Sequence, residues 1–171
     1  MSKGKVMLVD DEENVLNALV RCLRHGGYDL VTFPGPAEAL EYLRENQVDV
    51  IVSDHRMPGM TGTEFLIKAR KLYPDAVRVL LTGYADMDVA IRAVNEGKLF
   101  RFLTKPWQDE ELKITILNAL EMKGLLDRNR ALMGQVREQE GYIQTLKARH
   151  PGIDRVRRDS GGAIIIDEEE V

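Results

Sequence analysis

The sequence predicts an α/β fold, a doubly wound parallel sheet of five strands with helices on both faces. Short apolar, β-branched runs alternate along the chain with longer segments of helical periodicity. Five strand–helix units in succession favour parallel strands joined by right-handed crossovers. The length of 171 residues is sufficient for one such domain with a sizeable core, plus an extension.

The composition limits the classes of function. A hydrophobic content of 44% and a charged content of 30% are typical of a soluble globular protein, and a net charge of −4 gives no general reason to expect nucleic-acid binding. No apolar run approaches the length of a membrane span, and residues 1–10 lead into a strand rather than a signal sequence, so we expect a cytoplasmic protein. Cys22 is the single cysteine, which excludes an intramolecular disulfide.

The elements follow from apolar periodicity and from the residues that start and stop each one. Gly26 and Gly27 end the first helix, Pro36 opens the second, and Pro74 closes the third. The strands are expected at residues 5–9, 30–33, 48–53, 77–81 and 100–103. The helices are expected at residues 14–24, 36–45, 61–73, 87–95 and from 109 onward.

Asp54 stands where the third apolar run ends. The apolar run Val48–Ser53 is typical of a buried strand. Pro58 disfavours helix at Met57, so we expect Asp54 at a strand-to-loop corner in a cleft. The polar residues at the ends of three other strands are Asp10, Asp11, Thr82 and Lys105. These ends become neighbours if the sheet has the flavodoxin-like strand order 2-1-3-4-5.

Such a cleft needs a counter-charge. Two carboxylates repel each other by about 4 kcal/mol at about 4 Å and an effective dielectric constant of about 20. A divalent cation removes this cost, and oxygen ligands with room for water suit Mg²⁺. Lys105 adds a second cation and Thr82 a hydroxyl donor, so the cleft could neutralise a phosphoryl group on Asp54. Asp10 and Asp11 alone would more often be a helix cap, and the convergence with Asp54 favours the metal site.

Four motifs in this order resemble those of the receiver domain of two-component response regulators. They are VDDEEN at 9–14, SDHRMPGMTG at 53–62, LLTGYAD at 80–86 and FLTKPW at 102–107, and the resemblance covers about residues 4–122. It implies that Asp54 is the phosphoacceptor, that Asp11 is a direct Mg²⁺ ligand and that Asp10 is a ligand largely through water. The backbone carbonyl of Arg56 would be a further protein ligand.

The resemblance also implies how the site switches. Lys105 would pair with the incoming phosphoryl group, and a cis peptide bond between Lys105 and Pro106 would aim the lysine side chain into the cleft. Thr82 would move to form a hydrogen bond with that group. Phe102 stands where the family often has tyrosine, so it can respond by packing alone. Arg56 and Tyr84, two residues beyond Asp54 and Thr82, flank the path of an attacking water, and we expect them to set the lifetime of the phosphorylated form.

The expected function is a response regulator, phosphorylated on Asp54 by a sensor histidine kinase or phosphotransfer protein with Mg²⁺, that signals through protein contacts rather than as an enzyme. One alternative is the regulatory part of a longer protein, because a long charged helix after FRFLTKPW resembles receivers that precede cyclic-di-GMP phosphodiesterase or transcription-activator domains. A Mg²⁺-dependent phosphohydrolase of the haloacid dehalogenase type is disfavoured, since residues 10–14 lack its DxDxT-like run.

We expect three parts: a receiver domain at 1–122, a helical extension at 123–149 and a β-hairpin-like tail at 150–171. A candidate coiled-coil seam consists of Met122, Leu125, Asn129, Leu132, Val136, Gln139, Ile143 and Leu146. Asn129 would favour a parallel homodimer, whereas Gly124, Gly134 and Gly141 each cost a helix about 1 kcal/mol. A helix folded back on its own domain or frayed in solution remains the alternative. We expect no direct nucleic-acid contact and no membrane association.

Overall fold

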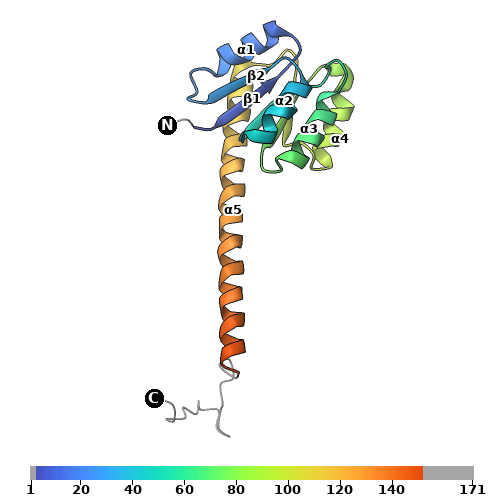
Figure 1. Ribbon diagram of the computed structural model, residues 1–171. Coiled ribbons are helices and arrows are strands. Elements are labelled where there is room, and N and C mark those ends of the chain that lie inside the picture. Colours follow the sequence, from blue (N-terminus) through green and yellow to red (C-terminus); the bar gives the residue numbers. More distant parts are fainter. Residues whose placement is uncertain (1–2, 152–171) are drawn as a thin grey trace, which may run out of the picture. The chain divides into compact units, whose positions relative to one another are not determined.

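The computed structural model describes residues 3–151. Within them, five parallel strands form one sheet in the order β2-β1-β3-β4-β5, which confirms the predicted fold and strand order (Figure 1). The strands are β1 (Lys5–Val9), β2 (Asp29–Phe33), β3 (Val50–Asp54), β4 (Val77–Thr82) and β5 (Arg101–Thr104). The helices are α1 (Glu13–Leu23), α2 (Pro36–Glu45), α3 (Gly62–Leu72), α4 (Met87–Asn95) and α5 (Asp109–Arg149), with a 3₁₀ helix η1 (Tyr84–Asp86).

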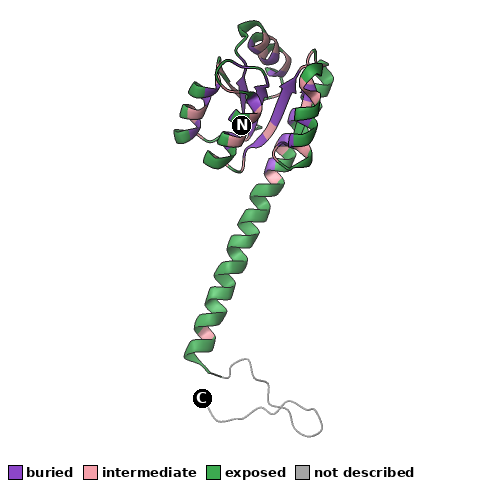
Figure 2. Cartoon of the chain, turned by 90° about the vertical axis from the view of Figure 1, so that its right-hand side faces the viewer, coloured by how far each residue is buried: buried purple, intermediate pink, exposed green. Residues whose placement is uncertain are grey.

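Helices cover both faces of the sheet, and each face has its own hydrophobic core. Successive strand residues point to opposite faces, so Ile51 lies in the core under α2, α3 and α4, while Val50 and Val52 lie in the core under α1 and α5. Figure 2 shows the most buried part of the fold in the sheet, where β1, β3 and β4 are buried at nearly every position. β3 is buried at every position because strands lie on both sides of it and helices cover both of its faces.

The start of α3 brings a helix close against the strand that carries Asp54. A Cβ atom at Gly62 would lie 1.9 Å from the Asp54 carbonyl oxygen, so only glycine fits there. The Gly62 N–H donates to the His55 carbonyl at 2.7 Å. Thr61 caps the helix, since its hydroxyl accepts from the Glu64 N–H while the Glu64 carboxylate accepts from the Thr61 N–H.

Three elements, β1, α2 and α4, have the predicted bounds, and the boundaries of the others differ from the predicted ones by one or two residues. β3 begins at Val50 rather than Val48 and extends to Asp54, because Asp54 pairs with Leu81 of β4 in the parallel ladder. β4 likewise extends to Thr82, which pairs with Thr104 of β5. The helix from Asp109 begins where predicted, whereas η1 was not predicted.

The chain divides into two units between Asp127 and Arg128, within α5. In the second unit, residues 128–149 belong to α5, and their side chains are exposed except for the half-buried Leu146. Between residues 3 and 151, no helix combines the length and hydrophobicity that a bilayer crossing needs. The tail expected at 150–171 lies outside the described residues from 152 onward.

Candidate phosphorylation site

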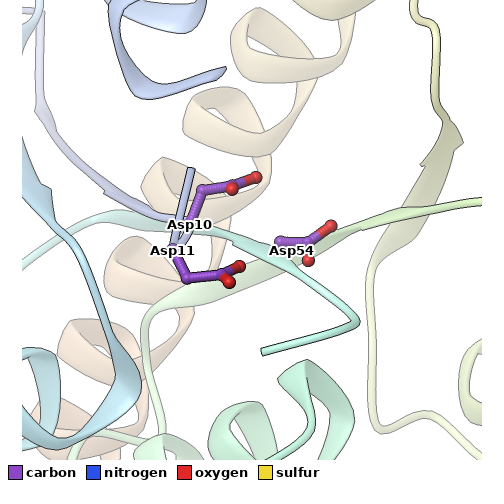
Figure 3. A group of neighbouring side chains, drawn as sticks. All are labelled: Asp10, Asp11 and Asp54. Carbon is purple, nitrogen blue, oxygen red and sulfur yellow. The ribbon is translucent and has the colours of Figure 1, made fainter. Parts of the chain in front are cut away.

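Three carboxylates meet at the carboxyl edge of the sheet. Asp10 and Asp11 directly follow β1, and Asp54 is the last residue of the neighbouring strand β3. One oxygen of each carboxylate lies within 4.8 Å of those of the other two (Figure 3). Asp10 and Asp54 are buried, whereas Asp11 is exposed. The predicted convergence of these acids therefore appears in the fold, and one of them faces solvent.

Lys105 joins two of these carboxylates. Its Nζ lies 2.7 Å from Asp10 Oδ2 and 2.7 Å from Asp54 Oδ1. The peptide between Lys105 and Pro106 is cis, as the family resemblance implies. Three carboxylates against one ammonium leave a formal charge of −2 in the cluster. The site thus contains one cationic side chain, that of Lys105, and has carboxylate oxygens left to bind a second cation.

The pKa values of the buried pair reflect competing effects. Burial raises the pKa of Asp10, although the hydrogen bonds from Lys105 and from the Glu12 N–H oppose that rise. Burial lowers the pKa of Lys105, but the hydrogen bonds and charges of Asp10 and Asp54 outweigh it, so this pKa lies above its ordinary value. One ammonium shared by two carboxylates does not offset the desolvation of Asp10, which is completely buried.

The residues predicted to respond to phosphorylation lie on β4 and β5. Thr82 is buried, and its hydroxyl donates to the Gly83 carbonyl at 3.2 Å. Phe102 pairs with Leu80 in the ladder, is half-buried and packs against the core under α4. Tyr84 is exposed, beyond the end of β4. Thr82 thus directly follows Leu81, the strand partner of Asp54, and its hydroxyl is bonded within its own loop.

An ion pair at this edge was not predicted. The Arg56 guanidinium donates from Nε to Asp86 Oδ2 at 2.5 Å and from Nη2 to Oδ1 at 3.1 Å. Asp86 ends the motif LLTGYAD, and an acidic residue just before a helix is usually expected to cap that helix. No sequence pattern relates it to Arg56, thirty residues away. His55, next to Asp54, is buried and contacts the Thr63 hydroxyl through Nδ1 at 3.2 Å.

The chain matches one protein family model and several curated proteins. The family model for the response regulator receiver domain matches residues 6–117. The hydrogenase transcriptional regulatory protein HoxA of Cupriavidus necator is 38% identical over 123 residues, which make up 72% of this chain and 25% of HoxA. The DNA-binding transcriptional regulator NtrC of Escherichia coli is 34% identical over 120 residues, 70% of this chain and 25% of NtrC. The chain therefore spans about a quarter of the length of these two relatives.

Solved structures agree with the sequence matches. A response regulator receiver domain protein from Clostridium thermocellum superposes with a TM-score of 0.68 at 34% identity, covering 74% of this chain and 99% of that one. A structure described as an adenylate cyclase from Rhodopirellula baltica superposes with a TM-score of 0.74 at 37% identity, covering 78% of this chain and 98% of that one. Because the family match extends over most of the first unit, this chain belongs to the receiver domain family of response regulators.

Proposed function

We propose that this chain is a two-component response regulator that accepts a phosphoryl group on Asp54. The observation that carries the proposal is the contact of 2.7 Å between Lys105 Nζ and the Asp54 carboxylate, inside a cluster of three acids. Phosphoryl transfer needs little covalent chemistry from a protein beyond a positioned nucleophile and preorganised positive charge. Asp54 supplies the nucleophile and Lys105 part of the charge.

The donor set fits Mg²⁺, which prefers one or two carboxylates and keeps several waters. We infer that Asp10, Asp11, Asp54 and the backbone carbonyl of Arg56 hold the ion. Asp10 acts largely through water, because its two oxygens already accept hydrogen bonds from Lys105 and from the Glu12 N–H. The exposed Asp11 is free to ligate directly. When bound, the ion supplies positive charge for the phosphoryl oxygens.

The donor in this proposal is a phosphohistidine on a sensor histidine kinase or phosphotransfer protein. An Asp54 carboxylate oxygen attacks the phosphorus, a P–O bond forms, and the P–N bond breaks. The imidazole nitrogen keeps the electron pair of that bond and then takes up a proton. Lys105 stabilises the charge on the phosphoryl oxygens. The product is an acyl phosphate on the chain itself, so the reaction sets a switch and does not turn over an external substrate.

We propose that Thr82 and Phe102 transmit the switch. The bond from the Thr82 hydroxyl to the neighbouring Gly83 carbonyl is long, and a phosphoryl oxygen is a stronger, charged acceptor. If Thr82 turns toward it, the half-buried Phe102 ring can repack in the space beside β4 and alter the face made by α4, β5 and α5. Since phenylalanine has no hydroxyl, this signal is carried by packing.

A second candidate is control of an output domain on a longer polypeptide. HoxA and NtrC are transcriptional regulators, and this chain matches about a quarter of each. In that case the receiver would act on an attached domain rather than on a separate protein. The mass of the protein isolated from its own cells distinguishes the two candidates.

The helical extension at 123–149 is the proposed dimer contact. Five apolar side chains of the predicted seam are exposed on α5, namely Met122, Leu125, Leu132, Val136 and Ile143. Apolar side chains at heptad spacing gain burial when two helices pair, and Asn129 in the same frame favours the parallel register.

Phosphorylation with a small phosphodonor tests the proposal directly. With acetyl phosphate and Mg²⁺, the intact protein should gain the mass of one phosphoryl group, and peptide mapping should place it on Asp54. Asp54→Asn should gain none. Asp29→Asn is the matched control, because Asp29 is an exposed carboxylate at the opposite edge of the sheet, and it should react like the wild type. Equal phosphorylation of Asp54→Asn at this site would refute the assignment.

A further inference from the structure

The ion pair between Arg56 and Asp86 joins the loops that follow two adjacent strands. Arg56 lies two residues after Asp54 in the loop between β3 and α3, and Asp86 lies four residues after Thr82, at the end of η1 and the start of α4. The two strands pair directly, with Asp54 opposite Leu81. The pair therefore links the loop after β3, the strand that ends with the proposed phosphoacceptor Asp54, to the start of α4, which belongs to the face made by α4, β5 and α5.

The geometry of this pair is more restrictive than its exposure suggests. Both carboxylate oxygens of Asp86 accept from the guanidinium, at 2.5 Å and 3.1 Å, which fixes the plane of the Arg56 side chain. Arg56 is 70% exposed, whereas Asp86 is only 17% exposed. An exposed ion pair adds little to the stability of a fold, so the effect of this one lies in where it holds the guanidinium.

The held guanidinium is within electrostatic reach of Asp54. The hydrogen bonds that Arg56 donates to Asp86 raise the pKa of Arg56, and the Asp54 charge contributes in the same direction. The hydrogen bond from Arg56 in turn lowers the pKa of Asp86. Phosphorylation would increase the negative charge at Asp54, so the position of this cation bears on the stability of the acyl phosphate.

We propose that Asp86 is a positioning residue that holds Arg56 beside the phosphorylated Asp54 and thereby lengthens the life of the acyl phosphate. The proposal rests on the proposed function and adds a residue to it. In hydrolysis, a water oxygen attacks the phosphorus, the bond from phosphorus to the Asp54 oxygen breaks, and Asp54 regains its carboxylate. Inorganic phosphate leaves with the protons of the water. A guanidinium held in the loop that follows Asp54 would obstruct part of the path of that water.

The test is a double-mutant cycle on the decay of the phosphorylated protein. Asp86→Asn should shorten the lifetime about threefold, a change on the scale of an exposed ion pair. In an Arg56→Ala background, which itself decays faster, Asp86→Asn should have no further effect. Asp86→Glu, which keeps the carboxylate, should restore most of the lifetime. An equal shortening by Asp86→Asn in both backgrounds, or none in either, would overturn the proposal.

The control variant is Asp88→Asn. Asp88 is an exposed carboxylate in the first turn of α4. Its replacement removes one negative charge from the N-terminus of the helix, as Asp86→Asn does, but leaves the ion pair between Arg56 and Asp86 intact. It should leave the lifetime unchanged. A loss equal to that of Asp86→Asn would show that helix stability, and not the position of Arg56, controls decay.

The salt dependence of the decay provides a second readout. Raising the ionic strength shortens the range of charge interactions from about 10 Å at 0.1 M to about 3 Å at 1 M. The wild type should therefore decay faster in high salt, while Asp86→Asn and Arg56→Ala should respond less. Absence of phosphorylation on Asp54 would overturn the proposed function itself, whereas normal phosphorylation with no coupling between the two residues would overturn this inference alone.

Discussion

The Lys105 ammonium serves two carboxylates at once, since Nζ lies 2.7 Å from Asp10 and 2.7 Å from Asp54. Asp10 is completely buried, so loss of the ammonium deprives its Oδ2 atom of the hydrogen bond that it accepts there. A buried acceptor left without its partner costs more than a typical hydrogen bond contributes. Lys105 therefore has a role in folding as well as its proposed role in phosphoryl transfer.

Replacement of Lys105 by methionine should lower the free energy of unfolding by about 1–3 kcal/mol, because Asp10 loses its buried partner. Urea denaturation at neutral pH measures this change. Lys113→Met removes an exposed lysine paired with Glu110 and should change the free energy of unfolding by less than about 0.5 kcal/mol. If the two variants were equally stable, the buried contact would have no energetic role.

Gly62 is a second residue on which the site depends. A Cβ atom there would lie 1.9 Å from the Asp54 carbonyl oxygen, so Gly62→Ala must move either α3 or the end of β3. Overpacking of this kind typically costs about 1–3 kcal/mol, and the variant should also be phosphorylated more slowly. Gly35→Ala is the control, because a Cβ atom at Gly35 would meet nothing within 4 Å. Wild-type stability in Gly62→Ala would contradict the close approach.

Among the elements, α3 has the clearest start signal. Thr61 and Glu64 form a capping box in which each side chain accepts from the backbone N–H of the other residue. The sequence TGTE predicts this start to within one residue, since the expected helix began at Thr61 itself. Boundaries set by local caps were therefore predictable, whereas the ends of β3 and β4 depend on pairing with neighbouring strands.

The capping box should make the stability of the fold sensitive to acid. The hydrogen bond from the Thr61 backbone N–H lowers the pKa of Glu64 below its ordinary value of 4.5. The stabilisation of the fold by the Glu64 carboxylate is therefore complete above that value. It is lost as the pH falls through the pKa of Glu64 in the folded state. Glu64→Gln should show a smaller loss of stability between neutral and acidic pH, as measured by urea denaturation across that range.

Thr61→Ala tests the other half of the same box. Loss of the hydroxyl leaves the Glu64 N–H without its acceptor and should cost about 0.5–2 kcal/mol. The pKa of Glu64, followed by NMR titration, should rise toward its ordinary value. An unchanged pKa in Thr61→Ala would show that the cap does not form in solution.

At the scale of the whole molecule, the sequence predicted the class of fold, the strand order and the meeting of Asp10, Asp11 and Asp54, because parallel strands deliver their carboxyl ends to one edge. It did not predict the contact between Arg56 and Asp86. That contact depends on the conformations of two loops, and neither residue has a local signature for it.

The helical extension yields a prediction about assembly. Leu132 lies at a seam position and is 61% exposed, so Leu132→Glu should reduce self-association of the full chain by placing a charge in the paired seam. Ala131→Glu adds the same charge one residue away, outside the seam, and should leave association unchanged. Sedimentation equilibrium measures both. If both variants associated like the wild type, the seam would not be the dimer contact.

The most direct test of the site is the uptake of Mg²⁺ by the full chain, followed by calorimetry. We predict one ion bound per chain in the wild type, with binding strongly weakened in Asp11→Asn and in Asp54→Asn, because each variant removes a carboxylate from the cluster at the end of β1 and β3. Asp29→Asn, at the other edge of the sheet, should bind like the wild type. No uptake by the wild type, or equal uptake by all four proteins, would contradict a metal site shared by these three acids.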